Sequence, residues 1–356
     1  MKKIYKFSIC FSCFIFLLCS CSSIDYRLIK IFPEETNIEF LKITDDNILG
    51  PCVIAYRKFI KWYTPNYIDI SPDGKKIAYV SIISNNNQQE YYFVIRNLID
   101  KKIILKKKMT KDISGFGFSK DGKKLVFSSF FDGSFNISIL DIETGEIKLN
   151  VVNTGANETT PIFSKDGSIF YTRISNIDDE YEKSPTTSRS LDKINNKEIN
   201  LNIEMGAYKI FSYKENKSKS LVDGYGPSLS SDDKKMAICK KDEENNSGAI
   251  WLIDSETGIG NPIVTSYKKS YSTARISPDG KKIVFVGSSL RKSSEMPVNL
   301  DIYVVNVDGT QLKQLTFHPG HDISPAWSSD MKSIYFISER GNANRNYGIW
   351  KVDIAN

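Results

Sequence analysis

Asp69-Ile-Ser-Pro-Asp-Gly-Lys-Lys-Ile-Ala-Tyr79 is one of six related segments in this chain of 356 residues. Close copies begin at Gly117 and Arg275, and more degenerate copies begin near Ile162, Ser228 and Ala326. The Ser that the six copies share stands at positions 71, 119, 164, 230, 277 and 328, so successive copies are 48, 45, 66, 47 and 51 residues apart. A period of this size indicates a repeat architecture in which each copy forms one supersecondary unit.

Each copy has the pattern of four short strands. The Ser-Pro-Asp-Gly segment is a turn, because Pro presets φ, Asp bonds its own backbone and Gly supplies a positive φ. An apolar strand follows, and after a variable loop comes a third strand such as Asp301-Ile-Tyr-Val-Val-Asn306. A second tight turn, Val307-Asp-Gly-Thr310, leads to a fourth strand, Gln311-Leu-Lys-Gln-Leu-Thr316. Four antiparallel strands per repeat predict an all-β fold, a six-bladed β-propeller.

The last repeat stops after its third strand, at Ile354. An open blade would leave an unpaired sheet edge, which proteins avoid. Asn37-Ile-Glu-Phe-Leu-Lys-Ile-Thr44 matches the fourth-strand pattern, so we expect it to pair with Gly348 to Ile354 and to join the two chain ends. The predicted propeller is a single domain over residues 37–356, with a loop insertion at 177–205 in blade 3.

The repeats, together with the passage from Leu315 to Ser328, resemble the six-bladed propeller of the TolB family and its periplasmic relatives. The resemblance covers about Tyr67 to Asn356, and it implies the fold more than a function. TolB carries an α/β domain before its propeller, and the stretch from Cys21 to Tyr67 is too short for one. The chain is therefore expected to be a TolB-like protein and not TolB itself, and TolB's binding of the peptidoglycan-associated lipoprotein is not carried over.

The first 20 residues have the features of a secretory signal peptide. Lys2, Lys3 and Lys6 form a basic start, an apolar run ends at Leu18, and small residues follow. The run is shorter than the roughly 20 residues that a membrane-spanning helix needs, so a transmembrane anchor is the less favoured alternative. We expect residues 1–20 to be removed on export.

Leu18-Cys19-Ser20-Cys21 resembles a bacterial lipobox. The resemblance implies that Cys21 is acylated and becomes the mature N-terminus, with residues 21–36 as a lipidated tether. A cut before Cys19 would place the bulky Leu18 beside the modified residue. Ser22 stands where an Asp would mark retention in the inner membrane, which implies the outer membrane, on its periplasmic or surface face.

Composition excludes several classes of protein. A quarter of the residues are charged and 40% are hydrophobic, which is ordinary for a globular domain and not for a disordered chain or a polytopic membrane protein. The formal charge of +6 falls to +3 without the three signal-peptide lysines, which is too little to suggest nucleic acid. After the signal and Cys21, only Cys52 and Cys239 remain, and both are expected to be free thiols.

Motifs of catalysis are absent from the sequence, so we expect no enzyme activity, no cofactor and no metal. One alternative remains. The two histidines, His318 and His321, lie beside Asp322 in the linker between blades 5 and 6. Some pectate-type lyases on related propellers use a His-bound metal, so a metal-assisted carbohydrate lyase or hydrolase is the second hypothesis. A zinc site needs three or four protein ligands, which favours an ordinary polar linker.

The expected fold sorts the loops between two faces. Linkers between blades and loops between second and third strands emerge on one face, and the Ser-x-Asp-Gly turns emerge on the other. The long loops 177–205, 288–299 and 339–347 share the face of the histidines. Arginine suits bidentate anion recognition, and loops on a rigid scaffold often bind ligands. The candidate ligand-binding residues are His318, His321, Asp322, Arg189, Arg291, Arg340 and Arg345.

The leading hypothesis is a non-enzymatic, lipid-anchored envelope protein, monomeric, that presents its loop-rich face to a protein, peptide or glycan partner. Long polar loops are also tolerated as insertions without a function, so a purely structural lipoprotein is a third possibility. The opposite face carries lysine pairs after the turns, which are typical solvated flanks of strand ends. They are Lys75-Lys76, Lys123-Lys124, Lys234-Lys235 and Lys281-Lys282.

Overall fold

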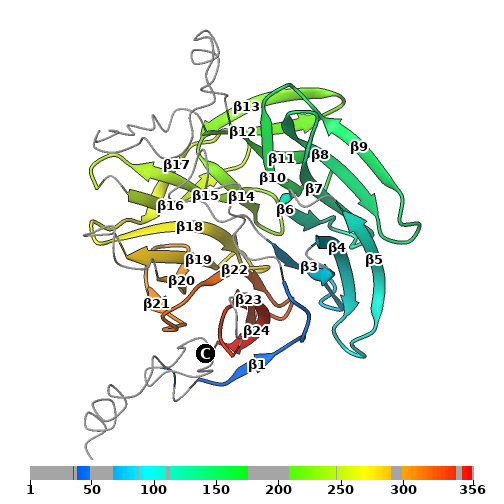
Figure 1. Cartoon of the computed structure of the whole chain (residues 1–356). Helices are drawn as coiled ribbons and strands as arrows, with labels where there is room; N and C mark the ends of the chain where they lie inside the picture. The colour runs from blue at the N-terminus through cyan, green and yellow to red at the C-terminus, as the bar shows by residue number, and fades with distance from the viewer. Residues whose placement is uncertain are drawn as a thin grey trace, which may run out of the picture.

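The computed structural model describes residues 35, 38–48, 67–85, 88–109, 113–174, 208–245, 247–289, 299–341 and 347–354. The strands of these residues form six antiparallel sheets of four strands each, arranged as blades around a common axis (Figure 1). The predicted all-β, six-bladed β-propeller is confirmed. Cys21, the predicted signal peptide 1–20 and the predicted insertion 177–205 lie outside the described residues.

The blades are numbered in chain order, and each runs from an inner strand at the axis to an outer strand at the rim. Blades 1 and 2 comprise β2 (Ile68–Ile70), β3 (Lys76–Asn85), β4 (Gln88–Asn97), β5 (Ile103–Met109), β6 (Ile113–Phe118), β7 (Lys124–Phe131), β8 (Ser134–Asp141) and β9 (Ile147–Val152). Blades 3 and 4 comprise β10 (Asn157–Phe163), β11 (Ile169–Ile174), β12 (Tyr208–Lys214), β13 (Lys217–Asp223), β14 (Tyr225–Leu229), β15 (Lys235–Asp242), β16 (Ser247–Asp254) and β17 (Gly260–Val264). Blades 5 and 6 comprise β18 (Lys269–Ile276), β19 (Lys282–Ser289), β20 (Leu300–Asn306), β21 (Lys313–Gln314), β22 (Asp322–Trp327), β23 (Ser333–Ser338), β24 (Gly348–Asp353) and β1 (Phe40–Lys42).

The repeated Ser-x-Asp turns join the inner strand of each blade to the second strand. In blade 1 the Ser71 hydroxyl donates to Asp73 Oδ1 at 2.5 Å, and Gly74 adopts a φ of 70°. The Ser71 bond, helped by the Lys75 backbone N–H, holds the pKa of Asp73 below its usual range. Degenerate turns keep this geometry, because Asp233 and Met331 stand in the Gly position with φ of 60° and 61°. The turn therefore survives the loss of Gly, at some cost in backbone strain.

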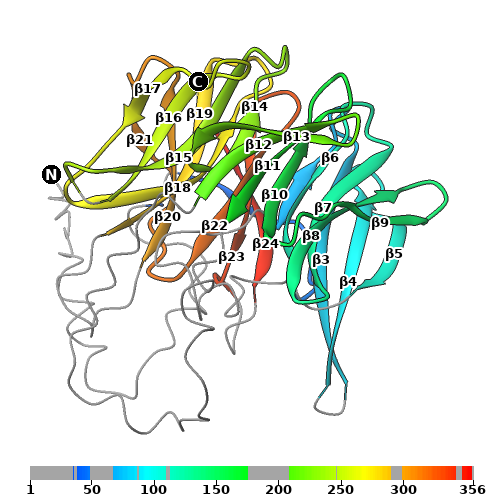
Figure 2. The ribbon, with the colours of Figure 1, turned by 90° about the horizontal axis from the view of Figure 1, so that it is seen from above.

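Apolar side chains between neighbouring blades form the core. Phe93 of blade 1 packs edge-on against Phe116 and Phe127 of blade 2, with ring centroids 5.1 Å apart in both pairs. All three rings are buried, and burying one such side chain contributes about 2 to 3 kcal/mol. Figure 2 shows the ring from the side, with the strands running between its two faces.

The N-terminal strand closes the ring, as the sequence predicted. β1 pairs antiparallel with β24 in the register Phe40↔Val352, Leu41↔Lys351 and Lys42↔Trp350. It supplies the fourth strand of blade 6, so the first and last strands of the chain share one sheet (Figure 1). The strand covers three residues, fewer than the eight of the predicted segment 37–44.

The chain continues from β1 to blade 1, and residues 38–48 are here called the closing segment. Ile48 bridges to Tyr347 of blade 6 and to Ser81 of blade 1. Asp46 accepts from Arg96 Nη2 at 3.0 Å and also from the Tyr79 hydroxyl. The closing segment thus ties blade 6 to blade 1 as well as completing blade 6. Over the described residues, no helix has the length and apolarity needed to cross a bilayer.

Candidate functional site

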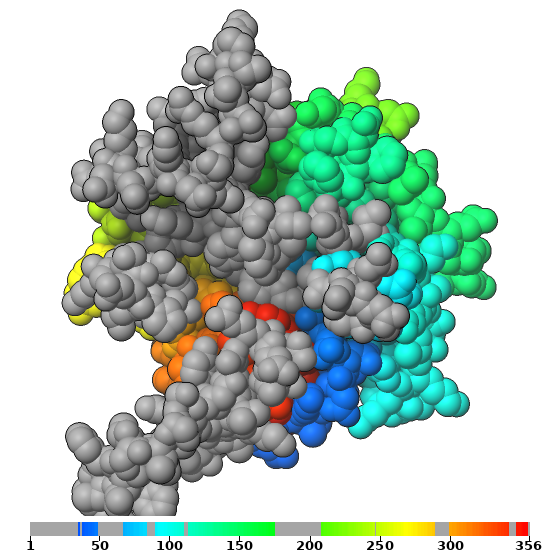
Figure 3. Space-filling view, in the orientation of Figure 1, coloured from blue at the N-terminus to red at the C-terminus, as the bar shows by residue number. Residues whose placement is uncertain are grey.

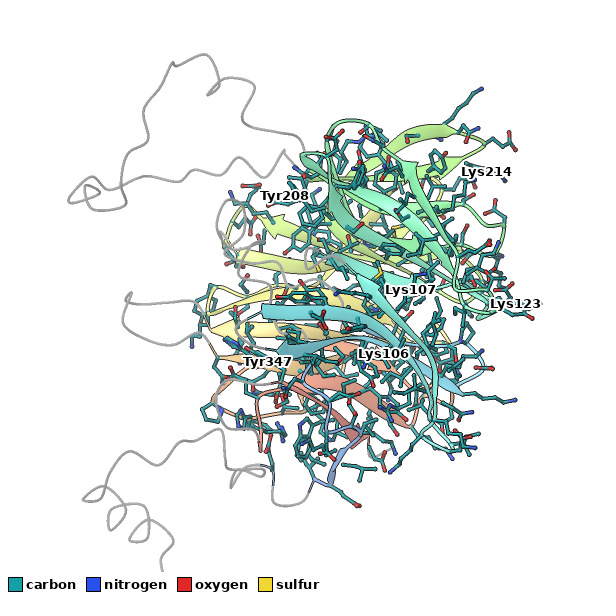
Figure 4. The ribbon with its side chains drawn as sticks, turned by 45° about the vertical axis from the view of Figure 1, so that its right-hand side comes forward. Lys106, Lys107, Lys123, Tyr208, Lys214 and Tyr347 are labelled. Atoms are coloured by element: carbon teal, nitrogen blue, oxygen red, sulfur yellow. The ribbon has the colours of Figure 1, made fainter. Side chains whose placement is uncertain are left out.

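The two ends of the ring differ in what they carry. Lys123 and Lys214 lie at the end where the Ser-x-Asp-Gly turns project, here called the turn face. Tyr208 and Tyr347 begin third strands at the opposite end, here called the loop face (Figure 4). Of the predicted ligand-binding residues, the structure describes His318, His321, Asp322 and Arg340, which lie toward the loop face. Three of them, Arg189, Arg291 and Arg345, lie outside the described residues.

Arg340 lies in a buried ion-pair cluster. Its Nη2 is 2.6 Å from Asp322 Oδ2 and 3.0 Å from Glu35 Oε1, and its Nη1 is 3.1 Å from Glu35 Oε2. The guanidinium carbon lies 4.0 Å from the centroid of the Phe40 ring. All three charged side chains are fully buried. Two carboxylates enclose the single guanidinium, and these charge-assisted hydrogen bonds offset the cost of burying the cation.

This position corrects the sequence prediction for Arg340, which grouped it with the loop arginines that would meet an anion. Arg340 follows β23 directly, and its side chain lies over the Phe40 and Phe336 rings of blade 6. It is matched by internal carboxylates instead of facing a ligand.

The boundary of the predicted tether also changes, because Glu35 accepts from the Phe317 backbone N–H at 2.9 Å and so belongs to the ring.

The two histidines sit close to this cluster but differ in setting. His318 is fully buried, and its Nδ1 accepts from the Gly320 backbone N–H at 3.0 Å. Burial lowers the pKa of His318, so the neutral imidazole is favoured. His321 is partly exposed and its Nδ1 lies 2.9 Å from the Tyr347 hydroxyl. Within the described ranges, no group of three or more His, Cys, Asp or Glu side chains converges as metal ligands would.

A funnel opens at the centre of the turn face. Its volume is about 410 Å³, and the inner strands of all six blades supply its wall. Two rings of side chains recur at fixed positions relative to the shared Ser. The residue just before that Ser is apolar in every blade: Ile70, Phe118, Phe163, Leu229, Ile276 and Trp327. The residue two places before it varies: Asp69, Gly117, Ile162, Ser228, Arg275 and Ala326.

An ion pair crosses one side of the funnel. Arg275 Nη2 of blade 5 is 3.0 Å from Asp69 Oδ1 of blade 1, across the small Ala326 of blade 6. Asp69 Oδ2 also accepts from the Phe118 backbone N–H at 2.8 Å. Burial raises the pKa of Asp69, while Arg275 and the Phe118 N–H oppose that rise. The pair is thus fixed at both partners, since the Arg275 carbonyl accepts from Trp327 Nε1 at 2.9 Å.

The opposite side of the funnel carries two more cations. Lys120 and Lys165 immediately follow the shared Ser in blades 2 and 3 and both line the cavity. The described lining therefore holds three cations and one carboxylate, together with a ring of six apolar side chains. Such a site can receive a ligand that has both an apolar group and an anionic group.

The sequence prediction missed this site, although the repeats contain the signal for it. Once the six copies are aligned on the shared Ser, the residues two places before it and one place after it differ in charge between copies, and both positions line the funnel. In a propeller, equivalent positions of successive repeats face the same axis. The aligned repeats place Asp69, Lys120, Lys165 and Arg275 at one mouth.

The fold defines a six-bladed β-propeller, and known proteins share parts of its sequence and its architecture. Residues 214–354 match the family model of the TolB beta propeller domain. With the six-bladed ring, this match shows that the chain carries a TolB-like β-propeller, as the repeats predicted.

Solved structures share the architecture at low sequence identity. A protein assigned to TolB from Agrobacterium tumefaciens gives a TM-score of 0.51 at 16% identity, over 82% of this chain and 90% of that chain. Oligogalacturonate lyase from Vibrio parahaemolyticus gives 0.50 at 12% identity, over 90% and 95%. These similarities show the fold alone. Dipeptidyl-peptidase 5 of Porphyromonas gingivalis is 33% identical over 72 residues, which span 20% of this chain and a tenth of the length of that curated relative.

Proposed function

We propose that this protein is a non-enzymatic, lipid-anchored envelope protein that binds a peptide segment of a partner protein in the turn-face funnel. The observation that supports this proposal is the funnel. Its volume, about 410 Å³, is in the range of sites that take a small ligand or a few side chains. Its ring of apolar residues and its cations suit a segment with one or two apolar side chains and a carboxylate.

The positions of the charged side chains in the funnel indicate which side of it the partner's carboxylate would bind. Arg275 is already matched by Asp69, whereas Lys165 lines the cavity on the opposite side. Lys120 lies 3.5 Å from Asp233, a looser pair. An incoming carboxylate is therefore expected to bind on the side of blades 2 and 3. Cys21 acylation would hold the funnel within reach of partners at one membrane, which raises their effective concentration.

Charge reversal at the funnel tests this function. In the double variant Lys120→Glu/Lys165→Glu, cross-linking of the tagged protein in intact cells should yield at least tenfold less of its main partner, because the rim then repels an acidic segment. The matched control is Lys123→Glu/Lys124→Glu, on the same turn of blade 2 but outside the funnel lining. Equal recovery of that partner by the wild type and both variants would reject the funnel as its site.

A further inference from the structure

A basic and apolar strip lies on the outer rim of blade 1. Residues 99–108, here called the rim strip, contain five lysines, one aspartate and three isoleucines. Ile99, Ile103 and Ile104 are 77%, 48% and 45% exposed. Single exposed apolar side chains are ordinary, but here three fall within six residues that also contain two lysines. This combination is typical of surfaces that bind at a membrane interface.

Acidic groups offset only part of this charge. Lys108 pairs with Glu90 at 2.5 Å, and Lys102 lies 3.9 Å from Asp100. No carboxylate of the described chain forms an ion pair with Lys101, Lys106 or Lys107. Figure 4 shows Lys106 and Lys107 on β5, the outer strand of blade 1. The rim strip therefore has a net positive charge that is open to an anionic surface.

The rim strip lies beside the segment that leads back to the predicted lipid. β1 is the outer strand of blade 6, and in Figure 3 its neighbourhood borders that of blade 1. A cavity of about 350 Å³ between blade 1 and the closing segment extends the apolar surface of the strip in this direction. Its lining includes Ile82, Ile83, Val94, Ile103 and Lys106, with Asp46 from the closing segment.

The distance to the predicted anchor is short. From Glu35 back to Cys21 the chain has 14 residues, which extend at most about 50 Å. Glu35 is fixed in the ring, so a lipid on Cys21 would keep the rim of blades 6 and 1 near the membrane. Glu35 contacts blade 6, which neighbours blade 1, so the predicted anchor joins the ring one blade away from the rim strip.

We propose that the rim strip docks on an anionic phospholipid surface. The isoleucines enter the boundary of the headgroups, and Lys101, Lys106 and Lys107 contact lipid phosphates. In this pose the ring stands on its rim with its axis along the membrane plane, so the funnel opens sideways over the bilayer. The proposal rests on the proposed lipid anchor only for the nearness of the membrane, because the contacts belong to the strip itself.

Vesicle sedimentation tests the docking without an acyl chain. Residues 21–356 carrying Cys21→Ser are mixed with vesicles of phosphatidylcholine alone or with 30 to 40 per cent phosphatidylglycerol, roughly the anionic content at which a polybasic surface binds. The parent should prefer the anionic vesicles and lose that preference at high salt. Two added variants, Lys106→Glu/Lys107→Glu and Ile103→Ser/Ile104→Ser, should each bind these vesicles at least about tenfold more weakly.

The matched control is Lys148→Glu/Leu149→Ser on β9, the outer strand of the neighbouring blade, where Leu149 is 58% exposed. It should bind like the parent. Equal binding by the strip variants, or a parent with no preference for anionic vesicles, would overturn the proposal. Loss of a protein cross-link in the strip variants, with vesicle binding unchanged, would also overturn it, in favour of a protein interface. None of these outcomes bears on the proposed binding of a peptide in the funnel, which the Lys120→Glu/Lys165→Glu variant tests separately.

Discussion

Arg340 and Glu35 are 305 residues apart in sequence and form a bidentate pair inside the fold. Local sequence could not predict this contact. Glu35 follows another glutamate in a polar stretch that resembles a tether, and Arg340 stands in a segment with the composition of a surface loop. The two residues meet only when β1 completes blade 6 and brings Glu35 next to Arg340, which follows β23. A residue whose role depends on ring closure carries no signal in its own neighbourhood.

Asp301 lies close to this cluster and has an unusual pKa. Burial, together with the negative charge of Asp322, raises the pKa of Asp301 to about 8. Its Oδ2 accepts from Asn299 Nδ2 and Gln314 Nε2, both at 3.1 Å. The titratable groups around it are Asp322, Glu35, Lys269 and Arg340. The neutral carboxyl is the form that the folded protein favours.

This shift predicts a pH dependence of stability. The pKa of Asp301 is higher in the folded state than the 3.8 of a free aspartate, so its contribution is complete below about pH 4 and is lost as pH rises through about 8. Between these values the free energy of unfolding of the wild type should fall relative to Asp301→Asn, by at most about 1.4 kcal/mol per pH unit. Denaturant unfolding from pH 4.5 to 8.5 measures the difference.

Asp308→Asn provides the control. Asp308 is exposed, and a hydrogen bond from Thr310 lowers its pKa, so its contribution is lost as pH falls and is constant above about pH 5. The difference between the wild type and Asp308→Asn should therefore not change from pH 5 to 8.5. If the difference for Asp301→Asn is equally flat, the buried carboxyl is ionised in the folded protein and the argument is wrong.

β1 shows what a strand pattern can and cannot predict. The apolar and polar order of residues 37–44, matched to the fourth strands of other repeats, predicted its partner β24 correctly. It did not predict the connection to blade 1 through Asp46 and Ile48, because those contacts depend on the positions of two other blades. The inner strands show the same limit. The bulge four residues before the shared Ser has a glycine in blades 2 and 4, but Thr160 and Thr273 adopt φ of 49° and 54° there without a residue that predicts it.

A proline in β1 tests how far closure depends on this strand. Ile43 N donates to Ile349 O at 2.8 Å, and antiparallel alternation places Leu41 in the next hydrogen-bonded pair, with Lys351. Leu41→Pro removes that donor and should lower the free energy of unfolding by about 1 to 3 kcal/mol. Leu41→Ala is the control, because the side chain is 54% exposed and its loss should cost less than about 0.5 kcal/mol. Equal denaturation midpoints for the two variants would contradict the closing role of β1.

At the scale of the whole molecule, the six repeated turns were enough to predict a six-bladed propeller. The funnel could be found only once the arrangement of the blades around the axis was known. The turn residues act locally, so their chemistry is visible in each copy. Asp69, Lys120, Lys165 and Arg275 are single polar residues in four different repeats, and they meet only around the axis. The sequence drew attention to the loop face because its loops are long, but the described residues there form an internal charge cluster, and the cavity opens on the turn face.

The central claim is that the partner binds the turn face and not the loop face. Site-specific photo-cross-linking tests this claim most directly. A photoreactive residue is placed at Ser231, an exposed residue of the funnel lining, or at Asp132, an exposed hairpin residue of the loop face. In intact cells the funnel position should give a discrete protein adduct that disappears in the Lys120→Glu/Lys165→Glu background, and Asp132 should give none. An adduct from Asp132 with none from Ser231 would show that the partner binds the loop face and would contradict the account.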